Sequence, residues 1–392
     1  MPSPTLILAI TTAIQSIVAL ATVAVPVLAP AAAADLGLSV GMVGYFISIM
    51  YVGASISALV SGGLILRYGS IRVSQVCLGL CAVSLLLLTI VPLPLIPVVA
   101  VLLGCGYGPI TPASSHVLAR TTPPHMMALT FSIKQTGVPF GAVLAGLVVP
   151  PLTLAFGWRT AALTVAVACL LMMVIAQTLR DALDTDRRLV HPLSLANFTT
   201  PFQLIFANPA IVRNVFTSQS YAGLQLTFVT FAVAYLTESL AYTLVAAGLA
   251  LSCANVGGVV ARIVWGWVAD RTRSARMVLG LLGVSMAAAT LGIAAFTPAW
   301  PYAAVLVVYV LFGITAVGWN GVQIAEVARL SPPGMAGVVS GGNTFITFLG
   351  IILLPAVFTL TRDATGTWGI AFVVVCLPAL AMGIMQLVYA RR

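Results

Sequence analysis

The sequence predicts an all-α integral membrane protein with twelve transmembrane helices, arranged as two pseudo-symmetric halves of six helices. Three observations support this prediction: the composition, the recurrence of long apolar stretches, and an internal repeat. Of the 392 residues, 61% are hydrophobic and only 6% are charged, whereas soluble domains carry about 25% charged residues. The mean hydropathy of +1.13 agrees with this class. We therefore expect no soluble domain.

Apolar stretches of about 20 or more residues recur along the chain, and each can cross the ~30 Å hydrocarbon core as a helix. The first stretch lacks a basic leading region and is longer than the apolar part of a signal peptide, so we interpret it as a retained span. The expected spans lie at residues 5–30, 40–65, 72–92, 95–119, 126–152, 158–179, 209–236, 243–268, 276–296, 300–328, 335–359 and 368–389.

The longest polar stretch, RDALDTDRRLVHPLSLANFTTPFQLIFANP, separates the sixth span from the seventh. This position predicts an N-terminal half at 1–179, a cytoplasmic linker at 180–208 and a C-terminal half at 209–392.

The distribution of arginines predicts the orientation, because Lys and Arg in short loops favour the cytoplasmic side. With both termini cytoplasmic, the outer side carries only Arg159 and Arg362. The cytoplasmic side then carries Arg67, Arg72, Arg120, Arg180, Arg187, Arg188, Arg213, Arg271, Arg273, Arg276, Arg329, Arg391 and Arg392. We expect a multi-pass protein of the cytoplasmic (inner) membrane, in contact with the lipid bilayer.

The formal charge of +9 is thereby explained by topology. Because no basic patch with interleaved aromatic residues occurs, we expect no nucleic-acid partner. The six cysteines lie in or beside apolar runs without metal-ligand spacing, so we expect packing roles, no metal and no cofactor.

An internal repeat relates the two halves. Residues 118–141 align without gaps to 327–350, which places Lys134 opposite Asn343. Residues 57–69 align to 261–273, which places Leu66 opposite Asp270. Parallel repeats of this kind are typical of membrane transporters, whose sites lie at the repeat interface near the midplane.

The loops after the second and eighth spans carry a motif of Gly, three residues, Asp, and then basic residues. The second half has it as Gly266, Asp270, Arg271, Arg273 and Arg276, and the first half as Gly62, Arg67, Gly69 and Arg72. With this motif, the span count and the repeat, the chain resembles the major facilitator superfamily over its whole length. The resemblance implies the major facilitator fold and alternating access, in which the two halves rock about a central site.

The Asp of the motif can accept hydrogen bonds from the free N–H groups at the start of a neighbouring helix, while the arginines anchor the loops at the headgroups. The first half has Leu66 at that place. Either the latch is weaker in this half, or a structural position has drifted.

Two cations are expected deep in the membrane, where an ionisable residue costs about 2.5 to 3.5 kcal/mol and needs a partner. Lys134, the only lysine, lies eight residues after Met126, and Arg262 lies eight residues before Asp270. At a rise of 1.5 Å per residue, each is about 12 Å below the cytoplasmic surface. They would share a depth near the midplane, one from each half.

None of the acidic residues is expected near that depth; they are Asp35, Asp181, Asp184, Asp186, Glu238, Asp270, Glu326 and Asp363. Two buried cations without a protein counter-ion indicate an anionic substrate, most simply a carboxylate, bound between Lys134 and Arg262. The structural alternatives are that Arg262 holds backbone carbonyls or Asp270, and that Lys134 is an interhelical hydrogen-bond donor.

The run Arg262, three residues, Gly266, three residues, Asp270 is similar to that of the oxalate:formate antiporter and related organic-anion carriers. This resemblance implies that Arg262 binds a substrate carboxylate. In that family the second cation is a lysine at the place of Asn343, whereas this chain has its lysine at the repeat-related Lys134.

Further polar residues lie on spans that line the cavity of the resembled family, although each could equally serve as an interhelical contact. The candidate substrate ligands are Gln15, Gln135, Tyr221, Gln225, Asn320 and Asn343. We expect His116, one turn from Arg120, and Glu326, three residues before Arg329, to make contacts at helix ends rather than to carry protons.

The function we expect is secondary active transport of small organic anions, not catalysis. We expect a monomer, and protons are a candidate coupling ion. No nucleotide-binding motif of the Walker type occurs, so a gradient must drive transport. The main alternative is an exporter of drugs or other hydrophobic compounds by proton antiport. A membrane sensor without transport is a further alternative, but the linker is too short for an output domain.

Overall fold

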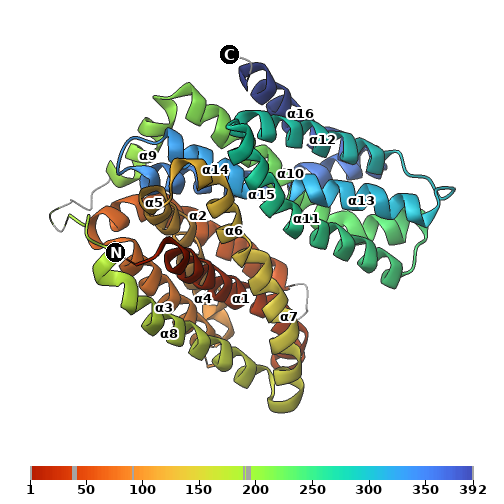
Figure 1. Cartoon of the computed structure of the whole chain (residues 1–392). Coiled ribbons are helices and arrows are strands. Elements are labelled where there is room, and N and C mark those ends of the chain that lie inside the picture. Colours follow the sequence, from red (N-terminus) through yellow and green to blue (C-terminus); the bar gives the residue numbers. More distant parts are fainter. Residues whose placement is uncertain (1, 38–41, 91, 189, 191–195, 391–392) are drawn as a thin grey trace. The chain divides into compact units, whose positions relative to one another are not determined.

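A computed structural model describes residues 2–37, 42–90, 92–188, 190 and 196–390 (Figure 1). The described residues form helices and connecting loops and contain no strand, so the prediction of an all-α membrane fold is confirmed. The helices of the first six spans are α1 (Pro4–Leu36), α2 (Met42–Tyr68), α3 (Ser70–Leu88), α4 (Ile96–Tyr107) with α5 (Ile110–Thr121), α6 (Met127–Gln135) with α7 (Gly137–Phe156), and α8 (Trp158–Leu183).

The helices of the last six spans follow a linker that contains α9 (Ala196–Phe206). They are α10 (Pro209–Leu240), α11 (Leu244–Thr272), α12 (Ala275–Ala294), α13 (Tyr302–Ala316) with α14 (Asn320–Leu330), α15 (Ala336–Thr365) and α16 (Trp368–Ala390). Short 3-10 turns precede α4 at Leu93–Leu95 and α6 at Pro124–Met126. By length and composition, 11 candidate spans occur within the described residues. Helix α10 has 32 residues but is more polar and is not among them.

The helices group into two units. The first consists of Met1–Thr122, Lys134–Ala207 and Ala328–Phe345, and the second of Pro123–Ile133, Asn208–Val327 and Ile346–Arg392. Each sequence half thus contributes one short segment to the unit built mainly by the other half. The boundary passes through α6, whose residues up to Ile133 belong to the second unit and whose Lys134 belongs to the first.

Packing within each unit repeats. In the first unit α3 packs on α8 and α2 packs on α4, and in the second unit α12 packs on α16 and α11 packs on α13. These are the third and sixth, and the second and fourth, spans of each half. The internal repeat of the sequence is therefore also a repeat of helix packing.

Within the described residues, three spans are each divided into two helices. The fourth is broken at Gly108 and Pro109, the fifth at Thr136, and the tenth between Ala316 and Asn320. Pro109 lacks the N–H that would continue the helix, and glycine adds freedom beside it. Extending the repeat alignment places the first break opposite residues 317 and 318, so the fourth and tenth spans are interrupted at equivalent positions.

The linker helix α9 was not predicted from the sequence. It packs within the first unit on α2 and α15: a Cβ atom added to Gly63 would lie 2.5 Å from the Asn197 side chain, and one added to Gly342 would lie 2.8 Å from Ile205. The ring of Phe202 meets that of Phe345 edge-on at 5.7 Å. Glycines on two spans therefore make room for a helix that local sequence, which includes Pro201, does not favour.

Candidate functional site

Lys134 occupies the last turn of α6 and is 1% exposed. Its Nζ donates to Oε1 of Gln15 at 2.7 Å and to Oε1 of Gln135 at 3.0 Å. Both partners are neutral amides, and an ammonium group has three N–H donors. Within the described part of the chain, no carboxylate forms an ion pair with Lys134. The structure thus brings together three predicted residues, and among the described residues the buried cation has no carboxylate as counter-ion.

Glycines place Gln15 beside Lys134. A Cβ atom at Gly137 would lie 2.8 Å from the Thr12 carbonyl oxygen and 3.0 Å from Cβ of Gln15, and one at Gly141 would lie 2.6 Å from Cβ of Ala19. The start of α7 can therefore lie directly against α1. Since α7 follows α6 after a one-residue break at Thr136, this close approach places Gln15 beside the last turn of α6, where Lys134 lies.

Arg262 on α11 is 4% exposed, and its Nε donates to the carbonyl oxygen of Val317 at 3.1 Å. Val317 lies in the break between α13 and α14, where the regular helical bonding is interrupted. Nearby, Nε1 of Trp265 donates to the Ile314 carbonyl oxygen at 3.0 Å and ties α11 to α13. One donor of Arg262 therefore binds a backbone carbonyl in this structure. This contact agrees with the alternative interpretation, in which Arg262 has a structural role.

Two other predicted ligands of the second unit, Tyr221 and Gln225, belong to a packed network. The Tyr221 hydroxyl donates to the Leu279 carbonyl oxygen at 2.8 Å, and its ring meets that of Trp319 edge-on at 5.8 Å. Nε1 of Trp319 donates in turn to Oε1 of Gln225 at 3.2 Å. Tyr221 is fully buried, whereas Asn320 is half-buried at the first position of α14. Trp319 thus joins the two predicted residues Tyr221 and Gln225.

Asn343 lies buried on α15, in the part of that helix that belongs to the first unit. Lys134 and its repeat-related position are therefore both in the first unit, whereas Arg262, Tyr221, Gln225 and Asn320 are in the second.

The motif aspartate of the second half, Asp270, binds the start of α6. Oδ1 of Asp270 accepts from the Ala128 N–H at 3.0 Å, and Oδ2 accepts from the Leu129 N–H at 2.8 Å. Gly266 is needed beside this contact, because a Cβ atom there would lie 2.5 Å from Oγ of Ser132. All these residues belong to the second unit.

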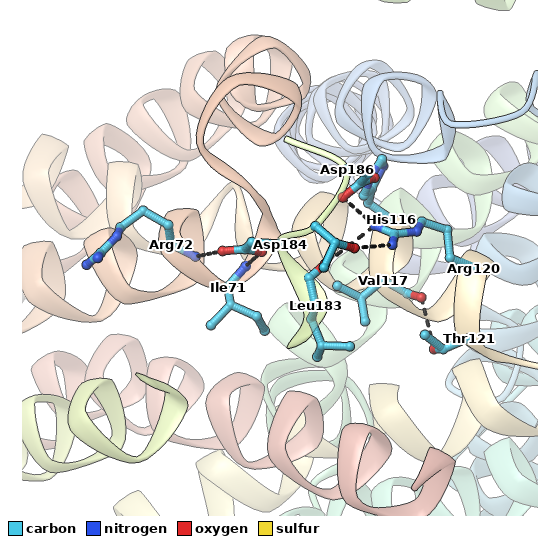
Figure 2. Close-up of polar contacts among 10 residues, drawn as sticks. Ile71, Arg72, His116, Val117, Arg120, Thr121, Leu183, Asp184 and Asp186 are labelled. Carbon is cyan, nitrogen blue, oxygen red and sulfur yellow. Dashed lines mark hydrogen bonds and ion pairs between the residues drawn. The ribbon is translucent and has the colours of Figure 1, made fainter. Parts of the chain in front are cut away.

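The first half is built differently, since Leu66 has no carboxylate. Gly62 still provides close packing, because a Cβ atom there would lie 2.6 Å from Cα of Val338. Gly69 adopts a left-handed φ of 93° beside Asp184. The carboxylate of this linker residue accepts from the N–H groups of Ile71 at 2.8 Å and Arg72 at 3.0 Å (Figure 2).

A second linker carboxylate, Asp186, binds the end of α5. Its Oδ2 lies 2.7 Å from Nε2 of His116, and its Oδ1 pairs with Arg120 (Figure 2). Burial tends to raise the pKa of Asp186, but the hydrogen bond from His116 and the charges of His116 and Arg120 outweigh it and lower that pKa to about 2. For Asp184, burial is the dominant influence and raises the pKa, against the lowering by its two N–H donors. Sequence reasoning missed both roles.

The remaining ion pairs of the described residues join helix ends. Oε1 of Glu326 lies 3.6 Å from Nε of Arg276, so this carboxylate makes an ion pair at a helix end. Asp35 pairs with Arg159 at 2.5 Å, and Glu238 pairs with Arg362 at 3.1 Å. The two arginines predicted on the outer side are thus each neutralised locally.

Comparison with known proteins adds evidence on the family. The family model described as Major Facilitator Superfamily matches residues 11–355. A gentisate transporter of Corynebacterium glutamicum is 25% identical over 274 residues, which is 64% of this chain and 57% of that protein. The multidrug efflux pump Tap of Mycolicibacterium fortuitum is 29% identical over 151 residues, which is 36% of this chain and 35% of Tap. The matches thus span about half or less of these relatives.

Solved structures show the same fold at low identity. The E. coli fucose:proton symporter FucP is 16% identical with a TM-score of 0.76, and the match covers 98% of each chain. The human organic anion transporter MFSD10 (TETRAN) is 15% identical with a TM-score of 0.76, over 98% of this chain and 100% of that one. At this identity the likeness concerns the fold alone.

Proposed function

Since the chain belongs to the major facilitator superfamily, we propose that it transports small organic anions, in particular carboxylates, with Lys134 and Arg262 as the anion ligands. Membership makes it a multi-pass membrane transporter of small molecules and not an enzyme. The nature of the substrate rests on the surroundings of the two cations.

The observation that carries the proposal is the burial of Lys134 among neutral groups. An ammonium removed from water is costly unless a counter-charge compensates it. Gln15 and Gln135 supply hydrogen bonds but no charge. A substrate carboxylate would supply the missing charge, and its binding energy would include the relief of this cost.

Arg262 is the second proposed ligand. Its planar guanidinium can bind a carboxylate through two parallel hydrogen bonds. In this proposal the bond from Nε to the Val317 oxygen orients the guanidinium from the side of the helix break. Broken helices recur around substrate sites in transporters because they expose backbone groups there.

The remaining proposed contacts support these two. Gln15, Gln135 and Asn343 would act in the first unit, and Tyr221, Gln225 and Asn320 in the second. The motif residues Gly62, Arg67, Gly69, Arg72, Gly266, Asp270 and Arg271 would serve the loops that open and close. We also propose a monomer in the inner membrane, made of two halves of six helices joined by the linker 180–208, with both termini cytoplasmic.

The gentisate transporter supports this substrate class, because gentisate is a carboxylate. The similarity to the multidrug efflux pump Tap supports a second candidate function, the export of drugs. Such an exporter would need an acidic residue at depth for cationic drugs. Within the described residues, the acidic side chains that form ion pairs do so at helix ends.

Transport by purified protein in proteoliposomes distinguishes the two functions. We expect uptake of labelled gentisate or benzoate, competition by unlabelled carboxylates, and no effect of lipophilic cationic dyes. Dye transport driven by a proton gradient and insensitive to carboxylates would favour the exporter instead.

A further inference from the structure

The carboxylates that bind helix ends on the cytoplasmic side belong to different parts of the chain in the two halves. In the second half, Asp270 and Glu326 lie on spans of that half. Their repeat-related positions in the first half are Leu66 and Val117, and neither can carry charge. Two linker carboxylates, Asp184 and Asp186, nevertheless bind the start of α3 and the end of α5 in the first half.

Asp184 attaches the linker to the start of α3. It is buried, and its two oxygens accept the N–H groups of Ile71 and Arg72, which a helix start leaves unsatisfied (Figure 2). Two residues after Asp186, the N–H of Arg188 donates to the carbonyl oxygen of Leu66 at 2.7 Å. The backbone of the linker therefore binds the very residue that stands in place of the motif aspartate.

Asp186 attaches the linker to the end of α5 through His116 and Arg120. His116 also reaches α15 within the first unit: a Cβ atom on Gly337 would lie 3.1 Å from Cβ of His116 and 3.3 Å from its Nδ1. The preceding residue, Ser115, accepts a hydrogen bond from Oγ of Ser340 at 3.2 Å. The same turn of α5 thus contacts the linker and α15.

We propose that Asp184 and Asp186 form a detachable latch, in which the linker supplies carboxylates to a half whose spans have Leu66 and Val117 at the repeat-related positions, and thereby holds α5 against α15. In the second half Asp270 binds the start of α6 directly. In the first half Asp186 acts through His116 on the start of α15. The proposal goes beyond the substrate and holds whatever the protein carries.

Trypsin tests the attachment of the linker in the full-length protein, because Arg187 and Arg188 are exposed and directly follow Asp186. Replacement of a charged hydrogen-bond partner should raise the population of detached linker about tenfold. We expect Asp186→Asn and Asp184→Asn to raise the initial cleavage rate after Arg187 and Arg188 by about that factor. Asp181→Asn, an exposed residue at the end of α8, is the matched control and should cleave like the wild type.

A cross-link tests the coupling to α15. Ser115→Cys with Ser340→Cys should form a disulfide under mild oxidation, scored by mass spectrometry as a peptide joining residues 115 and 340. We expect Asp186→Asn to lower the yield of this disulfide. Adding Leu66→Asp to the Asp186→Asn variant restores the motif carboxylate and should raise the disulfide yield again. Equal cleavage rates in Asp186→Asn and Asp181→Asn would overturn the latch. Faster cleavage with an unchanged cross-link yield would overturn the coupling to α15.

Discussion

The Nζ atom of Lys134 lies 2.7 Å from Oε1 of Gln15, so the chain's only lysine is buried against a neutral amide. The pair is 119 positions apart in sequence and is brought together by the close contact of α1 and α7 at Gly137. In the proposed function this cation binds the substrate carboxylate, so the relationship makes Gln15 as informative as Lys134 itself.

Gln15→Glu should give Lys134 an internal counter-ion at the position of the present amide oxygen. Because an ammonium and a carboxylate would then compensate each other, we expect the thermal stability to rise and the response to added carboxylates to disappear. Thermal unfolding with and without benzoate measures both effects. Gln75→Glu, another buried glutamine of the first unit, is the control, and it should leave the response to benzoate intact. Benzoate stabilisation in Gln15→Glu equal to that of the wild type would argue against an anion at Lys134.

Arg262→Lys should keep the charge and lose the planar pair of donors. We expect carboxylate affinity to fall about 10-fold in this variant and about 100-fold in Arg262→Gln, since a charged hydrogen bond contributes roughly 1.5 to 3 kcal/mol. Isothermal titration with benzoate measures the affinity. Arg159→Gln removes a cation that is already paired with Asp35 and should bind like the wild type. Equal affinities in Arg262→Gln and Arg159→Gln would leave Arg262 with a structural role only.

Asp270→Asn should loosen the start of α6. The amide keeps one oxygen but loses the second acceptor, so one of the two bonds from Ala128 and Leu129 is lost. We expect hydrogen exchange at residues 127–131 to accelerate about tenfold. Asp363→Asn, an exposed residue near the end of α15, provides the comparison. Unchanged exchange at 127–131 would show that Asp270 does not hold this helix start.

The stabilisation that the ion pair of Asp186 contributes should decrease at low pH. Its pKa of about 2 lies below the ordinary value of 3.8, so the stabilisation is complete above about pH 4 and is lost as the pH falls towards 2. The raised pKa of Asp184 acts oppositely, because protonation relieves the cost of burying its charge. We expect the difference in thermal stability between wild type and Asp186→Asn to shrink as the pH falls from about 4 towards 2. A difference that grows below pH 4 would contradict this sign.

Composition and periodicity predicted the spans well, because the bilayer requires long apolar helices and hydropathy alone reveals them. Each of the twelve predicted spans overlaps a helix or a pair of helices of the structure. The break at Thr136 and the linker helix α9 escaped prediction because both depend on tertiary packing. The absence of a side chain at Gly63 and Gly342 allows α9 to pack against α2 and α15, and no local sequence pattern distinguishes these two glycines from others.

The same limit applies to the candidate site. Depth along a span pointed to Lys134 and Arg262, but their first partners, Gln15 and the Val317 carbonyl, are distant in sequence. The repeat showed that Leu66 lacks a carboxylate, yet only the folded chain reveals that Asp184 and Asp186 lie nearby. The sequence signal for these two roles is the combination of an absent carboxylate at Leu66 with acidic residues in the linker.

Calorimetric binding of gentisate, benzoate and oxalate to purified wild type and to Lys134→Met tests the central claim most directly. Because removing one partner of a buried ion pair costs about 3 to 5 kcal/mol, we predict that a carboxylate bound by the wild type loses at least about 100-fold in affinity. The variant should unfold at the same temperature as the wild type or higher, since it no longer buries a charge. A Lys134→Met protein that binds the same carboxylate with wild-type affinity would contradict the account.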